Sequence, residues 1–163
     1  MLKIRTAVTE DLPILSDIYN ELYGNSILNE NWSHEKSEAL FKFFYKIQSD
    51  LFLVADVDGK AVGAVMSLVK PWHDGNRLIE TEIFVATDYQ KQGIASRLFR
   101  EHFKIAIEKY DAQVIEAHTY QEEDGNPLKW YKKQGYKVID SWYVINGNVK
   151  EAYEYFKNNC KGE

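Results

Sequence analysis

The fold is decided by one stretch of the chain, which reads Val85-Ala86-Thr87-Asp88-Tyr89-Gln90-Lys91-Gln92-Gly93-Ile94-Ala95-Ser96. An extended pattern over residues 77–86 runs into the start of this stretch. Apolar residues at helical spacing begin within it and continue over residues 92–110. The stretch therefore predicts a strand that turns directly into a long helix. Its core is Gln90-x-x-Gly93-x-Ala95, in which small residues allow the backbone to approach a ligand closely.

The start of that helix is a candidate anion site. The first turn of a helix has unpaired N–H groups and the positive end of the helix dipole, which together suit a pyrophosphate. A plainer interpretation is that Gly93 and Ala95 only let the helix begin tightly against a sheet, and these residues alone do not decide between the two. Two other phosphate motifs, G-x-x-x-x-G-K-[ST] and a G-x-G-x-x-G after the first strand, are missing.

Working outward, the pattern predicts an α/β (α+β) fold. The predicted strands cover residues 2–7, 51–57, 60–70, 77–86, 114–119, 136–145 and 149–157. The predicted helices cover residues 9–24, 33–47, 92–110 and 125–134. Asp58-Gly59 predicts a tight hairpin turn, because both central residues of that turn need positive φ. The last segment is predicted as a strand paired with 136–145, although the spacing of Ala152, Tyr155 and Phe156 also suits a helix. The result is a mixed sheet of about six to seven strands with about four helices on both faces.

Length and composition narrow the function classes. The 163 residues suit a single domain over 1–163, and 45% of them are hydrophobic. No apolar run approaches the ~18 residues of a membrane span, and residues 1–6 lack the features of a signal peptide. The single cysteine, Cys160, forms no internal disulfide, so we expect a cytoplasmic protein. The net charge is −5 with dispersed cations, and the histidines lack metal-ligand spacing, so neither nucleic acid nor a metal is predicted.

A second motif runs from Asn126 to Tyr136, with Pro127 placed for a helix's first turn and Gly135 for its end. With the Gln90 loop before it, and with Ile4-Arg5-Thr6-Ala7-x-x-Glu10-Asp11-Leu12 at the start, the chain resembles the GNAT superfamily of acetyl-CoA-dependent N-acetyltransferases. The resemblance covers nearly the whole chain. Its departures are mild: Ala95 stands where Gly is commoner, and Tyr136 where Phe is frequent.

The resemblance implies that acetyl-CoA is the co-substrate. The pyrophosphate would be held by backbone N–H groups of the loop that contains Gln90, Lys91, Gln92, Gly93, Ile94, Ala95 and Ser96. The strand end at Phe84 and Val85 would pair with the pantetheine amides, and Asn126 would touch the pantetheine arm. The partners are then acetyl-CoA and an amine acceptor.

The resemblance also implies the reacting groups. Glu80 and Glu82 lie on the strand that family members use for a general base, and their spacing of two puts both on one face. A bulge near Val85 would change that register, and a solvated polar face is the alternative role for each carboxylate. We expect Glu82, which lies nearer the reaction centre, to be the base, and Glu80 is the second candidate for that role. Tyr131 matches the family's general acid for the departing thiolate.

The implied activity is direct acetyl transfer to a primary amine of a small molecule or peptide, in a ternary complex. The alternative is a non-catalytic acyl-CoA-binding module with the same fold. The presence of Tyr131 and the two carboxylates argues against this alternative.

The acceptor's identity stays open. Residues 71–74 either line the acceptor site or form a polar hairpin, and Tyr19, Tyr23 and Trp32 flank a loop beside it. Aromatic residues near the end suit either a homodimer contact or a sheet core; they are Trp142, Tyr143, Tyr153 and Tyr155.

Overall fold

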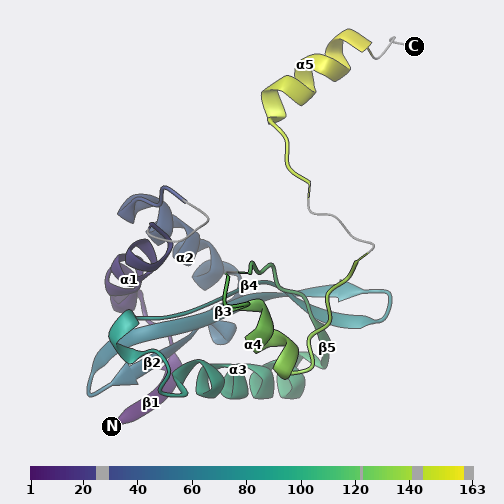
Figure 1. Cartoon of the computed structure of the whole chain (residues 1–163). Coiled ribbons are helices and arrows are strands. Elements are labelled where there is room, and N and C mark those ends of the chain that lie inside the picture. Colours follow the sequence, from purple (N-terminus) through teal and green to yellow (C-terminus); the bar gives the residue numbers. More distant parts are fainter. Residues whose placement is uncertain (25–29, 122, 141–144, 160–163) are drawn as a thin grey trace.

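The protein is a mixed sheet with helices on both faces (Figure 1). Its architecture is taken from a computed structural model that describes residues 1–24, 30–121, 123–140 and 145–159. The strands are β1 (Leu2–Thr6), β2 (Leu53–Val57), β3 (Lys60–Trp72), β4 (Gly75–Val85) and β5 (Ala112–Ile115). The helices are α1 (Leu12–Gly24), α2 (His34–Gln48), α3 (Ile94–Tyr110), α4 (Leu128–Lys133) and α5 (Val149–Asn159). Short 3₁₀ turns lie at Thr9–Asp11, Ser49–Leu51 and Thr87–Tyr89.

The strands follow one another across the sheet in sequence order, β1-β2-β3-β4-β5. The first four pair antiparallel, and β5 pairs parallel to β4 after the crossover through α3. The predicted hairpin between β2 and β3 is confirmed, since Asp58 and Gly59 have φ of 52° and 87°. The predicted passage from strand to helix after Val85 is confirmed as well.

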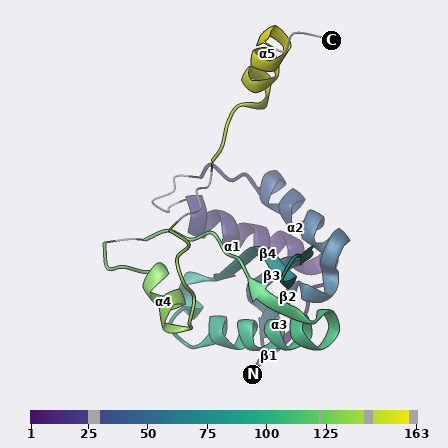
Figure 2. The ribbon, with the colours of Figure 1, turned by 90° about the vertical axis from the view of Figure 1, so that its right-hand side faces the viewer.

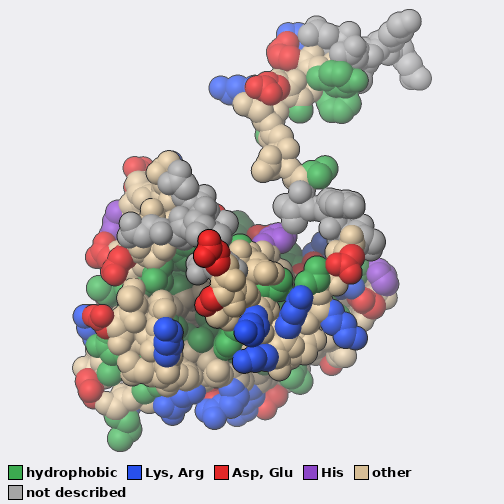
Figure 3. All heavy atoms as spheres, in the orientation of Figure 1, with side chains coloured by type: hydrophobic (Ala, Val, Ile, Leu, Met, Phe, Trp, Pro, Cys, Tyr) green, Lys and Arg blue, Asp and Glu red, His purple; other side chains and the backbone are tan. Residues whose placement is uncertain are grey.

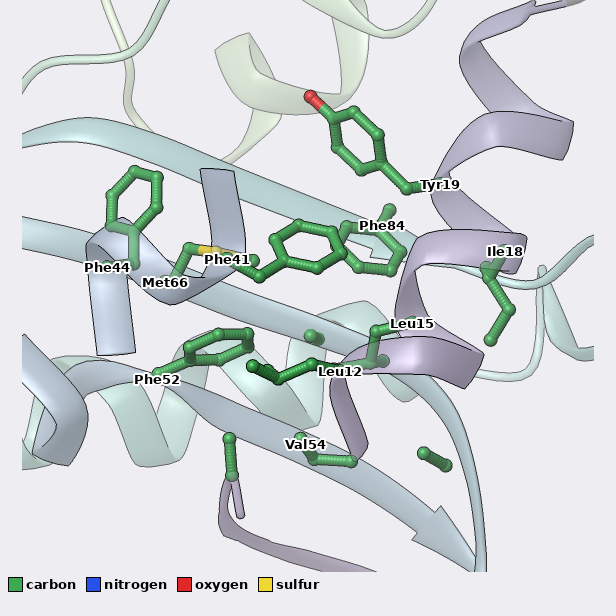
Figure 4. Close-up of a cluster of buried hydrophobic side chains, with 13 residues drawn as sticks. Leu12, Leu15, Ile18, Tyr19, Phe41, Phe44, Phe52, Val54, Met66 and Phe84 are labelled. Carbon is green, nitrogen blue, oxygen red and sulfur yellow. The ribbon is translucent and has the colours of Figure 1, made fainter. Parts of the chain in front are cut away.

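Each face of the sheet has its own apolar layer. Helices α1 and α2 cover one face, and α3 covers the other (Figures 1 and 2). Helix α1 turns Leu12, Leu15 and Tyr19 inward at helical spacing, where they meet Phe41 of α2 and Phe84 of β4. Figure 4 shows Tyr19 at the rim of this cluster, with its hydroxyl pointing away from the other labelled side chains. The core therefore fixes the ring of Tyr19 and leaves its polar end for another partner.

The sheet has fewer strands than predicted. The prediction of a second strand for the terminal hairpin is wrong, because residues 149–159 form helix α5. Asn148 explains the difference: its Oδ1 accepts from the backbone N–H groups of Lys150 and Glu151 at 2.9 and 3.2 Å, which caps a helix start. Residues 136–140 form no strand either, and 141–144, including Trp142 and Tyr143, lie outside the described residues.

Helix α5 stands away from the sheet in both views (Figures 1 and 2). Tyr153 and Tyr155, which the sequence placed at a dimer contact or in a sheet core, are both 63% exposed on this helix. They are therefore not part of the core. Among the described residues, no helix has the length and apolar character needed to cross a membrane.

Candidate active site

The site lies where β4 and β5 separate. The two strands pair from Asn76 to Leu78, and the backbone N–H of Glu116 donates to the carbonyl of Leu78 at 2.8 Å at the end of this pairing. Beyond that point β4 continues to Val85 beside β3, while the chain after β5 runs on without a ladder to β4. Since parallel strands that part leave an open crevice at their carboxyl ends, this is where a ligand site is expected.

A cavity of about 570 Å³ occupies this place. It is lined from α1, from the segment before α2, from β4, from the loop after β4 and the first turn of α3, from the segment after β5 and from α4. The polar or aromatic side chains in its wall are Tyr19, Tyr23, Glu30, Trp32, Glu80, Thr81, Glu82, Phe84, Gln90, His118, Thr119, Tyr120, Trp130 and Tyr131. The cavity thus gathers residues from across the chain around the second half of β4.

A bulge in β4 sets the direction of the two candidate carboxylates. Ile79 is paired with Leu68 and Glu82 with Met66, so Glu80 and Thr81 together face the single residue Ser67. Glu80 has a φ of 50°, which is rare for a non-glycine residue. The expected break in register therefore lies at Glu80–Thr81 instead of near Val85. Simple alternation does not hold across it, yet both Glu80, which is exposed, and the half-buried Glu82 line the cavity.

Glu82 is held by a tyrosine from α1. The Tyr19 hydroxyl donates to Glu82 Oε2 at 3.2 Å. Burial raises the pKa of Glu82 to about 7; the charges of Glu30 and Glu80 also raise it, and the hydrogen bond from Tyr19 lowers it. Glu82 is therefore a carboxylate whose proton affinity is matched to neutral pH, which is the property a general base needs.

Tyr131 reaches the same cavity from α4. Its ring lies edge-on to those of Trp130 and Tyr136, with centroids 5.0 and 5.1 Å away, and it packs against Phe99 of α3. Burial raises the pKa of Tyr131 to about 12, with smaller contributions from Tyr136 and the Glu82 charge. The phenol therefore stays protonated at neutral pH and is able to donate a proton.

The loop between β4 and α3 closes tightly on the strand end. The Gln90 amide Nε2 donates to the carbonyl of Val85 at 3.0 Å, and that of Gln92 donates to the carbonyl of Asp88 at 3.0 Å. Gly93 precedes α3 with a φ of 77° and without a side-chain cap, so the N–H groups of the first helical turn have no side-chain acceptor there. A side chain built at Gly93 would meet no atom within 4 Å, which shows open space beside this turn.

The predicted cofactor residues divide into three groups. Phe84, Val85, Gln90 and Ala95 line the cavity. The rest of the loop lies beside it without lining it; these residues are Lys91, Gln92, Gly93, Ile94 and Ser96. Asn126 does not line the cavity either: it is exposed, and its side chain and backbone N–H both donate to Asp124 at 2.8 Å.

The segment that carries Asn126 is nevertheless near the loop. Lys129 and Lys91 both help to hold the pKa of Asp124 below its usual range, behind the hydrogen bonds from Asn126. Lys and Arg side chains also gather on the lower part of the face in Figure 3, over α3 and α4. Arg97, Arg100, Lys132 and Lys133 are exposed on these helices. This surface suits a ligand with several phosphate charges.

Sequence reasoning missed part of the wall. His118, Thr119 and Tyr120 follow β5 directly, and the rule that ligands bind at the carboxyl ends of parallel strands would have found them. No sequence signal of this kind indicates that Glu30 lines the cavity. Residues 71–74, one candidate for the acceptor wall, span the end of β3 and the turn to β4 and do not line this cavity. Among the described residues, no cluster of three or more potential ligands is arranged for a metal ion.

Comparison with known proteins agrees with this geometry. Residues 12–148 match the model of the acetyltransferase (GNAT) family. A curated relative, acetyltransferase SG1711 of Sodalis glossinidius (strain morsitans), is 31% identical over 106 residues, which are 65% of this chain and 70% of the relative. The crystal structure of a possible acetyltransferase from Clostridium difficile 630 covers 91% of this chain and 99% of its own at a TM-score of 0.73 and 16% identity. The crystal structure of a transcriptional regulator from Bacillus halodurans C-125 covers 91% of this chain and 100% of its own chain, at a TM-score of 0.68 and 19% identity.

Proposed function

Because this chain belongs to the GNAT acetyltransferase family, we propose that it transfers the acetyl group of acetyl-CoA directly to a primary amine of a small molecule or peptide. The observation that carries the proposal is Glu82, a half-buried carboxylate with a pKa of about 7 in a cavity that also contains Tyr131. A base that takes the proton of the amine and an acid that protonates the departing thiolate both accelerate acylation of an amine by a thioester.

The cofactor would lie along the end of β4 and the start of α3. The N–H groups of Gln92 to Ser96 would hold the pyrophosphate, since the first turn of α3 has no side-chain cap. The backbone at Phe84 and Val85 would pair with the pantetheine amides. There β3 and β4 approach so closely that a Cβ on Gly63 would lie 2.6 Å from the carbonyl oxygen of Phe84, which fixes the strand end. Asn126 would reach the pantetheine arm by exchanging its bonds to Asp124.

Glu82 would prepare the amine. An alkylammonium has a pKa of about 10.4 and does not attack a thioester until it loses a proton. An ordinary glutamate lies about 6 pH units below it, whereas Glu82, with a pKa of about 7, lies only about 3 units below. The raised pKa of Glu82 therefore removes roughly 4 kcal/mol from the cost of moving the proton.

Tyr131 would assist the departing group. When bound, acetyl-CoA supplies an activated acetyl thioester, and the thiol that leaves has a pKa of about 8.5. Because burial keeps Tyr131 protonated, its hydroxyl is available to donate to the sulfur as the bond breaks. Positioning both reactants in one cavity contributes more than either proton transfer, since orientation alone supplies about 7–11 kcal/mol.

The test is release of free thiol from acetyl-CoA across a panel of amines, beside calorimetry of CoA binding. Thiol release that depends on an amine, with an N-acetylated product by mass spectrometry, is expected. Tight CoA binding without turnover on any amine would instead identify a non-catalytic acyl-CoA-binding module. Absence of CoA binding would contradict both the acetyltransferase and the acyl-CoA-binding module.

A further inference from the structure

We propose that the acceptor is a small molecule with two ammonium groups, one taken up by Glu82 for acetylation and the other paired with Glu30. This inference rests on the proposed function and names the substrate class of the same cavity. It is carried by three features of the cavity wall: its charge, the way its carboxylates are held, and its aromatic surface.

The wall carries several negative charges. Glu30, Glu80 and Glu82 all line the cavity, and no Lys or Arg is among the described residues that do so. The charges of Glu30 and Glu80 both act on Glu82, so the carboxylates are close enough to repel one another. The other titratable lining groups are His118 and the tyrosines of the wall. A ligand with a single ammonium would leave most of this repulsion in place, whereas a dication would relieve it.

The two carboxylates are held by one chain of contacts. Glu30 Oε2 accepts from Trp32 Nε1 at 2.6 Å, and the Trp32 ring meets the Tyr19 ring edge-on with centroids 5.2 Å apart. Tyr19 in turn donates to Glu82. Glu30 is therefore placed relative to Glu82 by packed rings, and each carboxylate has two oxygens with several acceptor sites, of which these bonds occupy one.

The rest of the wall suits the body of such a ligand. Tyr19, Trp32, Trp130 and Tyr131 present aromatic rings to a cavity of about 570 Å³. Aromatic faces attract ammonium groups and pack against methylene or sugar-ring carbons. Because the cavity would also receive the acyl end of the cofactor, the space that remains for the acceptor suits a compact molecule. We therefore favour a small diamine, such as an alkyl diamine or a diamino sugar, over an amine on a peptide.

The first test compares acceptors with purified protein and saturating acetyl-CoA. The panel contains diaminoalkanes of three to six carbons, a diamino sugar, and monoamines of matched size. We expect kcat/KM to be about 10- to 100-fold higher for the dications than for their matched monoamines. The two dication groups separate an alkyl from a sugar acceptor. Equal kcat/KM values overturn this inference and leave the proposed function intact, while transfer to no amine overturns the proposed function.

The second test removes the proposed partner of the distal ammonium. Glu30→Gln keeps the acceptor for Trp32 Nε1 and removes one charge, so the preference for dications should fall by about 10-fold or more. Glu108→Gln is the matched control, because Glu108 is exposed on α3 and does not line the cavity. The preference should survive in that control. CoA affinity of both variants shows that they are folded, and a preference that survives in Glu30→Gln overturns the inference.

Discussion

The hydroxyl of Tyr19 donates to Glu82 Oε2 at 3.2 Å and joins α1 to the bulged strand β4 across 63 residues of sequence. Tyr19 is 2% exposed, and its ring packs edge-on against Phe41 and Phe84. The hydrogen bond stabilises the charged form of Glu82, while burial of the carboxylate stabilises the neutral form. The pKa near 7 is the balance of these opposing effects.

Tyr19→Phe should shift that balance upward. The ring and its packing remain, but the hydrogen bond that lowers the pKa of Glu82 is lost. A general base works in its deprotonated form, so kcat/KM rises with pH through the pKa of the base. We expect the midpoint of this rise, near pH 7 in the wild type, to move up by about one pH unit. A pH profile of kcat/KM with one amine measures it, and an unmoved midpoint would separate Glu82 from the base role.

Glu82→Gln should lower kcat by about 10²- to 10³-fold and abolish the rise of kcat/KM near pH 7. The glutamine still accepts from the Tyr19 hydroxyl and fills a similar volume, so the loss reports on the carboxylate itself. Glu80→Gln is the matched comparison, because Glu80 lines the same cavity but is exposed at the bulge. We expect a smaller loss there. The reverse order of the two variants would assign the base to Glu80.

Tyr131→Phe should reduce kcat by about 10²- to 10⁴-fold, since the phenol is the proposed donor to the leaving thiolate. The ring contacts with Trp130 and Tyr136 are kept, so CoA affinity should change little. Single-turnover measurement of thiol release separates the chemical step from product release. Turnover near that of the wild type would exclude Tyr131 as the acid.

Local signals in the sequence predicted the frame of the site. The hairpin at Asp58-Gly59 and the entry to α3 at Gly93 each depend on a few adjacent residues with a demanding backbone conformation. Such features can be predicted because they depend on residues that are adjacent in the sequence. The carboxylate strand was predicted from its extended pattern over residues 77–86, and β4 covers Gly75–Val85.

Contacts between distant segments were beyond the sequence. Nothing near Glu30 in the sequence indicates that its carboxylate lines a cavity with Glu82 of β4. The bulge at Glu80 depends on the pairing with Ser67, which alternation along one strand does not reveal. At the end of the chain, by contrast, the aromatic residues fit a strand or a helix, and a local signal that sequence reasoning missed, Asn148 as an N-cap, favours the helix.

A last prediction concerns the dependence of stability on pH, in which the buried His102 and the half-buried Glu82 have opposite effects. His102 of α3 is fully buried, with Nε2 2.8 Å from the Ser67 hydroxyl opposite the β4 bulge. Burial lowers the pKa of His102 to about 4. Between about pH 4 and 6.5 the unfolded chain binds a proton there that the folded protein does not, so folding weakens as pH falls. Glu82 has a raised pKa of about 7, so the folded protein binds the extra proton between about pH 4.5 and 7, and folding strengthens as pH falls.

Each effect amounts to about 3 kcal/mol over its window, so in the wild type they largely cancel. The free energy of unfolding in urea should therefore change little between pH 7 and 5 on account of these two groups. His102→Gln removes the first effect, and its stability should rise as pH falls. Glu82→Gln removes the second, and its stability should fall over the same range. Hydrogen bonds and ion pairs hold the pKa of carboxylates such as Asp11 and Asp50 below the usual range, so these groups add only a shared background to all variants. Parallel pH profiles for the two variants would show that at least one of these groups is not held in its buried, neutral-favouring environment.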